Sequence, residues 1–282
     1  MSLIVPPLAH LPRTREALDQ VATLLDLSLE PARRFRKSGT GLENDLRIAV
    51  ALHGLSALDA ARAVHLLSGT GNAGTVPAGY RTICDCLVKI RWMRADPQRA
   101  RVYLVAEPFE RYALASESIK KSPRWPVIIA DCKKALEDHP WILKLDGATD
   151  TKGKPQYDKI VWALRMPSPE GMAQAVGMDE DDHLLDTGIS SLAPHTSVVH
   201  TKNFARSLNI DGTINLSTSL DPIMLLWYVS RSTARLGAVT NEVLNVFPDG
   251  AVAYKAAEVE RDVTKAIMML KAYMDGLKSV AG

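Results

Sequence analysis

The residues best suited to chemistry gather in one polar stretch, Asp181 to Lys202, which lies between mostly apolar helical segments. It holds three of the chain's seven histidines, together with serines and aspartates. Histidine titrates nearest to neutral pH and is the natural general base, and a neighbouring serine hydroxyl supplies a nucleophile or a proton. The candidate catalytic residues in this stretch are therefore Ser191, His195 and His200.

The spacing of these histidines limits what they can bind. His195 and His200 are five residues apart, which on a helix separates their side chains by about 140°. They would not chelate one metal ion as an i, i+4 pair does, so we expect no metal site and no cofactor. If Pro194 begins a helix, His195 lies in its first turn, where the helix dipole favours the neutral imidazole.

A predicted helix over residues 78–93 must position partners for this stretch. Its residues Arg81 and Asp85 form an i, i+4 pair on one face. If that face is buried, the pair needs polar neighbours, and Ser191 or His195 would supply them. His195 would then act as a catalyst, taking a proton from a hydroxyl while Arg81 stabilises a phosphate charge. Alternatively it donates to Asp85 and holds helices together, which is the simpler role because buried polar groups usually satisfy one another.

Helical periodicity dominates the rest of the chain, with apolar residues at three- and four-residue spacing. The best β-signal is NIDGTINLST at residues 209–218, where we expect a small hairpin or an extended loop. Because alternating strand–helix units are missing from the pattern, the sequence predicts an all-α, multi-helix bundle. We expect an N-terminal helical arm over residues 1–41 and a bundle domain over residues 42–282, with helices near 15–27, 42–67, 98–119, 125–136, 221–247 and 251–280.

Composition narrows the class of protein. The chain has 282 residues, 46% of them apolar and 23% charged, with a net charge of +2, which gives no reason to expect tight non-specific binding to nucleic acid. Its three cysteines predict neither a disulfide framework nor a zinc site, and free thiols fit a cytoplasmic protein. We expect no membrane span or signal peptide. The five tryptophans are scattered, which is typical of core or interface anchors.

Residues 69–74 spell GxGxxG, the pattern of a dinucleotide-binding loop. That loop needs a strand before it and a helix after it, so that helix N-terminal amides face the phosphate. The sequence before Gly69 is helical in pattern. We therefore interpret this stretch as an interhelical loop with Gly69 as a helix C-cap.

Two segments carry a resemblance to a known group. GYRTICDCLVKIRWMRADPQRARVYL, residues 79–104, holds an Arg, an acidic residue four positions later, an apolar stretch and an Asp-Pro break. The Ser/His element ending at His195 is followed by a variable loop and a long amphipathic helix from about residue 221. Over roughly residues 42–247 the chain resembles a large bacterial family of helical proteins of unassigned function, which lies near the HEPN-like helical bundles. A Pro precedes His195 here, and a second His follows at position 200.

The resemblance implies a helical bundle in which Arg81 and Asp85 face His195 and either Ser190 or Ser191. Ribonucleases of the HEPN superfamily carry an Arg and a His four to six residues apart, and Arg47 and His53 match that spacing. A chain of this composition is expected to contain about one such match by chance, so the match by itself carries little information. By analogy, we expect a bacterial stress or phage-defence factor that acts on RNA. The alternative is a non-enzymatic interaction module or homodimeric scaffold, which could bury the polar cluster that an enzyme must expose.

Overall fold

A computed structural model describes residues 6–33, 41–69, 76–178 and 222–249, together with residues 252–255, 257, 258 and 261. The prediction of an all-α fold is confirmed: within these ranges no strand forms, and one isolated bridge joins Thr149 to Pro155. The hairpin expected at residues 209–218 lies outside the described ranges. The elements are α1 (Pro6–Ser28), α2 (Glu30–Arg33), α3 (Leu42–Gly69), α4 (Val76–Ala95), α5 (Pro97–Leu114), α6 (Glu117–Lys120), α7 (Arg124–Asp138), η2 (Pro140–Lys144), α8 (Tyr157–Ala163), α9 (Pro169–Ala175) and α12 (Pro222–Val246).

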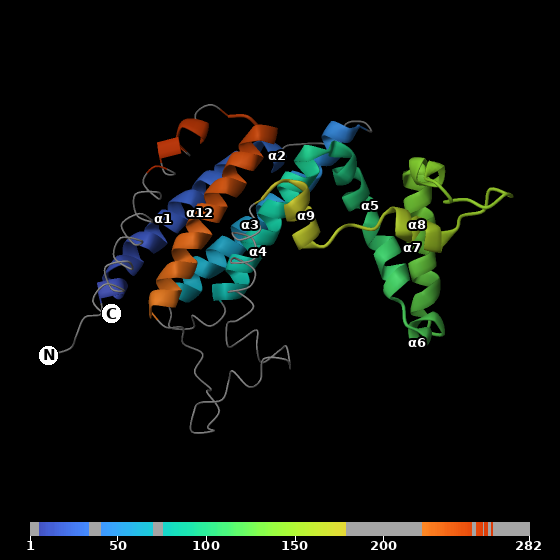
Figure 1. Ribbon diagram of the computed structural model, residues 1–282, viewed down its shortest axis with the longest axis horizontal. Coiled ribbons are helices and arrows are strands. Elements are labelled where there is room, and N and C mark those ends of the chain that lie inside the picture. Colours follow the sequence, from blue (N-terminus) through green and yellow to red (C-terminus); the bar gives the residue numbers. More distant parts are fainter. Residues whose placement is uncertain are drawn as a thin grey trace, which may run out of the picture. The chain divides into compact units, whose positions relative to one another are not determined.

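The chain divides into two compact units. Unit 1 comprises residues 1–37, 50–92 and 169–282, and unit 2 comprises residues 38–49 and 93–168. This division differs from the predicted boundary between residues 41 and 42, because α1 packs along α12 and so belongs to unit 1 (Figure 1). Among the described helices, none is both long and apolar enough to cross a membrane.

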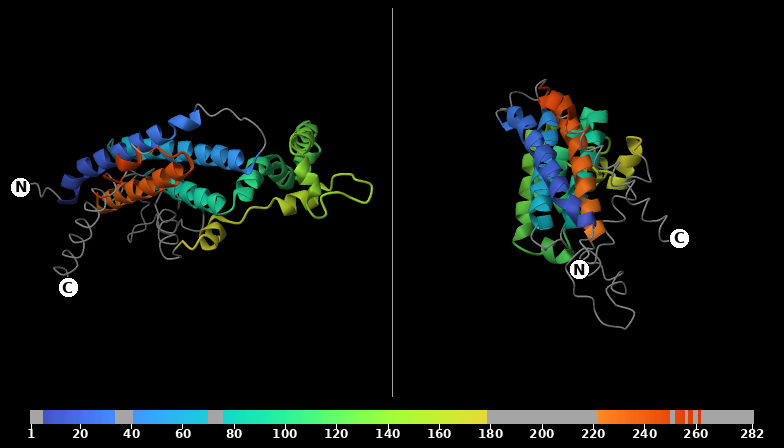
Figure 2. Two further views of the ribbon diagram at one scale, coloured as in Figure 1. Left: turned by 90° about the horizontal axis from the view of Figure 1, so that it is seen from above. Right: turned by 90° about the vertical axis from the view of Figure 1, so that its left-hand side faces the viewer.

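Unit 1 is built around α1, α12 and the parts of α3 and α4 that it contains, which run beside one another in both views of Figure 2. Near one end, the Arg15 side chain of α1 donates to the His65 carbonyl of α3 at 3.0 and 3.1 Å. Near the other end, the Cβ position of Gly54 on α3 would lie within 3.4 Å of both Leu29 and Val243. The helix α3 therefore runs antiparallel to α1 and α12.

The helices α4 and α12 run in the same direction. The rings of Tyr80 and Trp227, near the two N-terminal ends, are 5.6 Å apart, and Arg91 pairs with Glu242 towards the C-terminal ends. Two parallel helices cannot be joined by a tight turn, so the chain must return between them. The connection between the end of α4 and the start of α12 is long and includes most of unit 2.

The core of unit 1 follows the predicted helical periodicity. Many of its apolar side chains are at most 1% exposed. Several hydroxyl side chains inside the core donate to the carbonyl four residues earlier, as Ser230 does to Leu226 and Thr240 does to Leu236, so they need no partner on another helix. The most buried apolar residues include Leu18, Leu25, Leu58, Ala61, Val64, Ile83, Leu87, Ile90, Leu226, Val229, Leu236 and Val239.

Unit 2 has a separate core between α5, α7, η2 and α8. Asp96 begins α5 by accepting a hydrogen bond from the Gln98 amide at 3.0 Å, so the predicted Asp-Pro break is present. The first turn of α3 joins this unit through Asp45, which pairs with Arg101 at 3.0 Å while the Arg101 guanidinium lies 5.5 Å from the Trp141 ring centre. The core residues are Val105, Phe109, Cys132, Leu136, Ile142, Ala148, Ile160 and Leu164.

The helix α1 begins earlier than the sequence pattern predicted. The sequence pattern predicted a helix near residues 15–27, whereas α1 begins at Pro6 and continues through Pro12. Proline is tolerated in the first turn of a helix because those amides have no intrahelical acceptor, which accounts for Pro6 and Pro7. Pro12 lies inside the helix, where it removes one intrahelical hydrogen bond. The predicted beginning near residue 15 was therefore wrong.

Gly79 permits the close approach of α3 and α4. A Cβ atom there would lie 2.6 Å from Val64 Cγ2 and 3.2 Å from the Ala60 carbonyl oxygen. We expect Gly79→Ala to destabilise the protein by roughly 1–3 kcal/mol, despite alanine's better helix propensity. Gly237→Ala is the matched control, because nothing lies within 4 Å of that Cβ position in α12 and the change should stabilise by roughly 0.5–1 kcal/mol. Urea unfolding measures both, and equal effects would contradict the packing.

His53 makes the stability of unit 1 depend on pH. It is 6% exposed, and burial, with a smaller effect of the nearby Lys89 charge, lowers its pKa from 6.5 to about 4. Between these values the unfolded chain binds the proton and the folded chain does not, so stability falls as pH is lowered from 6.5 to 4, by about 3 kcal/mol in total. We expect His53→Gln to flatten this part of the profile in urea unfolding at several pH values. A slope equal to that of the wild type would contradict the account.

Candidate functional site

The arginine seam is a charged contact between α4 and α12 of unit 1. We use this name for Arg81 and Arg91 of α4 with Arg231 and Arg235 of α12, together with the carboxylates Asp85 and Glu242. On α12 the residues 227, 231, 235 and 242 follow helical spacing and lie on one stripe. The seam therefore brings together residues separated by about 150 positions, and only the fold makes them neighbours.

The predicted pair on α4 is present and partly exposed. The Nε atom of Arg81 lies 4.0 Å from Oδ2 of Asp85, and the two side chains are 43% and 29% exposed. This is a loose contact of the i, i+4 kind, worth little by itself in water. The guanidinium of Arg81 thus remains accessible to a ligand.

Arg91 and Glu242 make the tightest pair of the seam. Nε of Arg91 donates to Oε1 of Glu242 at 2.8 Å, and the carboxylate side chain is only 12% exposed. Burial lowers the pKa of Arg91, and the nearby positive charge of Arg235 lowers it further. Two arginines are thus held close together in a partly desolvated place, where like charges repel more strongly than in water.

Three aromatic rings pack together at one end of the seam. The Tyr80, Trp227 and Tyr228 rings contact one another edge to face, with centres 5.1 to 5.6 Å apart. The guanidinium of Arg231 lies 5.7 Å from the Trp227 ring centre, a cation–π distance that fixes where its charge sits. Partly desolvated guanidinium groups attract phosphate and carboxylate anions, so the seam is suited to binding an anion.

The other half of the predicted cluster is not placed. Ser191, His195 and His200 lie outside the described residues, so the predicted meeting of these side chains with Arg81 and Asp85 stays a prediction. In the ranges that are described, no three His, Cys, Asp or Glu side chains form a group suited to a metal ion.

The two sequence matches to known motifs have structural explanations. The helix α3 continues to Gly69, so the dinucleotide-binding interpretation of residues 69–74 fails for lack of a preceding strand. The position of Gly69 has no room for a side chain, because the guanidinium of Arg15 occupies the place where a Cβ atom would lie. Arg47 pairs with Glu43 at 2.9 Å, while His53 is buried and neutral, so these two residues do not form an exposed Arg/His site.

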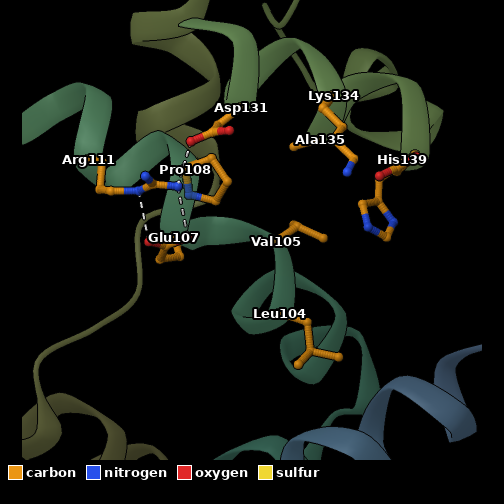
Figure 3. Close-up of a pocket in the computed structure, with 10 residues that line it drawn as sticks. Leu104, Val105, Glu107, Pro108, Arg111, Asp131, Lys134, Ala135 and His139 are labelled. Carbon is orange, nitrogen blue, oxygen red and sulfur yellow. Dashed lines mark hydrogen bonds and ion pairs between the residues drawn. The ribbon is translucent and has the colours of Figure 1, made fainter. Parts of the chain in front are cut away.

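Unit 2 contains a hollow of about 250 Å³ between α5 and α7, which sequence patterns did not indicate (Figure 3). At one side of it Arg111 is clamped by Glu107 at 2.8 Å and Asp131 at 3.1 Å. Lys134 and His139 lie across the hollow, with apolar side chains at its base. Because both carboxylates engage Arg111, this arrangement is better suited to joining two helices than to binding an anion.

Comparisons with protein-family models, with curated proteins and with solved structures find no match to this chain.

Glu242 should be necessary for the seam. Glu242→Gln removes the carboxylate that pairs with Arg91 and leaves the repulsion between Arg91 and Arg235, so we expect a loss of roughly 1–2 kcal/mol in urea unfolding. Added salt should restore part of this loss by screening the repulsion. Glu117→Gln is the control, because its pair with Lys120 is exposed and should contribute nothing measurable. A loss in the Glu242 variant that is insensitive to salt would argue against repulsion as its cause.

Proposed function

We propose that this protein is a HEPN-like helical-bundle factor that acts on RNA, in bacterial stress or phage defence. The observation that carries the proposal is the arginine seam, to which α4 and α12 each supply two arginines and in which Arg91 pairs with the largely buried Glu242. RNA is the polyanion that the resemblance to HEPN-like bundles suggests, and its phosphates are the groups that paired guanidinium side chains bind best. The defence role rests on the resemblance alone.

The chemistry at the seam would follow from its composition. Arg81 is accessible enough to hold a phosphate, and Asp85 would orient it or a neighbouring histidine. If His195 meets this pair, its neutral imidazole would take the proton from a ribose 2′-hydroxyl while Arg81 stabilises the negative charge on the phosphate. Ser191 and His200 are the other candidates for this proton transfer.

A second function has an observation in its favour. Leu52, Leu55 and Leu66 of α3 are 50%, 37% and 62% exposed, and helical geometry places them within about 60° of one another. An exposed apolar stripe of this kind is typical of an interface, and a two-fold axis across it would pair the same leucines from two copies. The alternative is therefore a non-enzymatic, homodimeric scaffold that uses α3.

Arg81→Gln/Arg235→Gln tests the leading proposal. With fluorescein-labelled oligouridine, we expect anisotropy to show binding that is about tenfold weaker than that of the wild type. The salt slope, which is the slope of the logarithm of the binding constant against the logarithm of the salt concentration, should be smaller by about 1.4, because each phosphate contact contributes about 0.7 for single strands. Arg13→Gln, an exposed cation on α1, is the matched control and should leave the slope nearly unchanged.

Denaturing gels of the same samples separate binding from cleavage. The His195→Ala variant is included as a further sample, and circular dichroism checks the fold of each protein. Cleavage by the wild type that the folded His195 variant lacks would support an enzyme. A wild type that binds no RNA, and has twice the chain mass of 30.8 kDa in light scattering, would contradict the proposal and favour the scaffold.

A further inference from the structure

The side chain of Trp162 is 75% exposed, although tryptophan is one of the most buried residue types on average. It lies on α8, and Ile160 of this helix and Leu164, which follows its end, are almost completely buried in the unit 2 core. The core thus fixes the orientation of α8 and directs Trp162 into water. Folding alone gives no reason for an indole at this position.

Two cations flank Trp162 at a spacing of one helical turn. Lys159 precedes it by three residues and Arg165 follows it by three, and both side chains are exposed. The Arg165 amide donates to the Trp162 carbonyl at 3.3 Å, so the helical turn continues to this residue. Within the part of the chain that the structure describes, no ion pair involves either cation.

We propose that Trp162, Lys159 and Arg165 form a stacking platform for single-stranded RNA. This inference deepens the proposed function and rests on it. One face of the indole would stack against an unpaired base, and the two cations, three residues before and three residues after Trp162, would contact the phosphates on either side of that base. Bases of a duplex are already stacked and hide their faces, so the platform selects single strands.

The surroundings favour RNA over other occupants. An interfacial membrane helix needs a broad apolar face, whereas Ile160 and Leu164 of this short helix already lie in the core. A protein interface would need further apolar side chains around the indole, and here Trp162 has a charged residue one turn away on each side. Lys and Arg outnumber Asp and Glu by fourteen to ten in residues 93–168, which also favours a polyanion.

Trp162→Leu and Lys159→Gln/Arg165→Gln test the platform in the full chain. With fluorescein-labelled oligouridine we expect Trp162→Leu to bind about tenfold more weakly at an unchanged salt slope, because stacking is not ionic. The double variant should lower the salt slope by about 1.4. The difference in affinity between Trp162→Leu and the wild type should be much smaller for an RNA duplex than for oligouridine. Leu114→Ala, which changes another exposed apolar residue of unit 2, and Lys133→Gln are the controls.

The outcomes separate this inference from the proposed function. If Trp162→Leu binds oligouridine as tightly as the wild type while Arg81→Gln/Arg235→Gln is weakened, the platform is overturned and the action on RNA stands. A wild type that binds no RNA overturns both. Retained RNA binding by Trp162→Leu with lost binding to anionic lipid vesicles would assign the side chain to a membrane surface and also overturn the platform.

Discussion

The parallel contact between α4 and α12 is the constraint on which the rest of unit 1 depends. It joins Arg91 to Glu242 across 151 positions of sequence and Tyr80 to Trp227 at the other end. Since parallel neighbours require a crossover connection, this contact requires a long connection between the end of α4 and the start of α12. The same contact gathers arginines from both helices, so the topology and the candidate site have one cause.

The charged residues between α4 and α12 lower the stability of this contact, although they would also allow it to bind an anion. An apolar seam would serve packing at least as well, because partly buried ion pairs contribute little net stability. The proximity of Arg91 and Arg235 adds repulsion to that cost, and Glu242 offsets part of it. A stability cost retained in this way is typical of a functional site, where anion binding would relieve the repulsion.

Helical periodicity predicted which residues form the core but not which helix covers them. The helix predicted near residues 15–27 carries Leu18, Val21 and Leu25 at helical spacing, and each is at most 3% exposed. In the helix predicted over residues 78–93, Ile83, Leu87 and Ile90 follow the same spacing and are fully buried. Periodicity identifies an apolar face without identifying its partner, so the packing of α1 against α12, across about two hundred residues, could not be predicted.

The candidate site was predicted in part, for the same reason. The Arg81–Asp85 pair depends on local helical spacing and could be predicted from sequence, whereas Arg91 and Glu242 meet only through the fold. Trp162 was expected to anchor a core or an interface, and its exposure depends on how the Ile160 face of α8 is buried. Ser191, His195 and His200 stay predictions, because they lie outside the described residues.

The central claim is that RNA contacts the arginine seam. Ultraviolet cross-linking of bound oligouridine to the full chain, followed by mass spectrometry of the peptides, tests it most directly. The account predicts cross-links in the peptides of α4 and α12 that contain Tyr80, Arg81, Trp227 and Arg231, and their loss in Arg81→Gln/Arg235→Gln. Cross-links that avoid both helices, or that are unchanged in that variant, would contradict it.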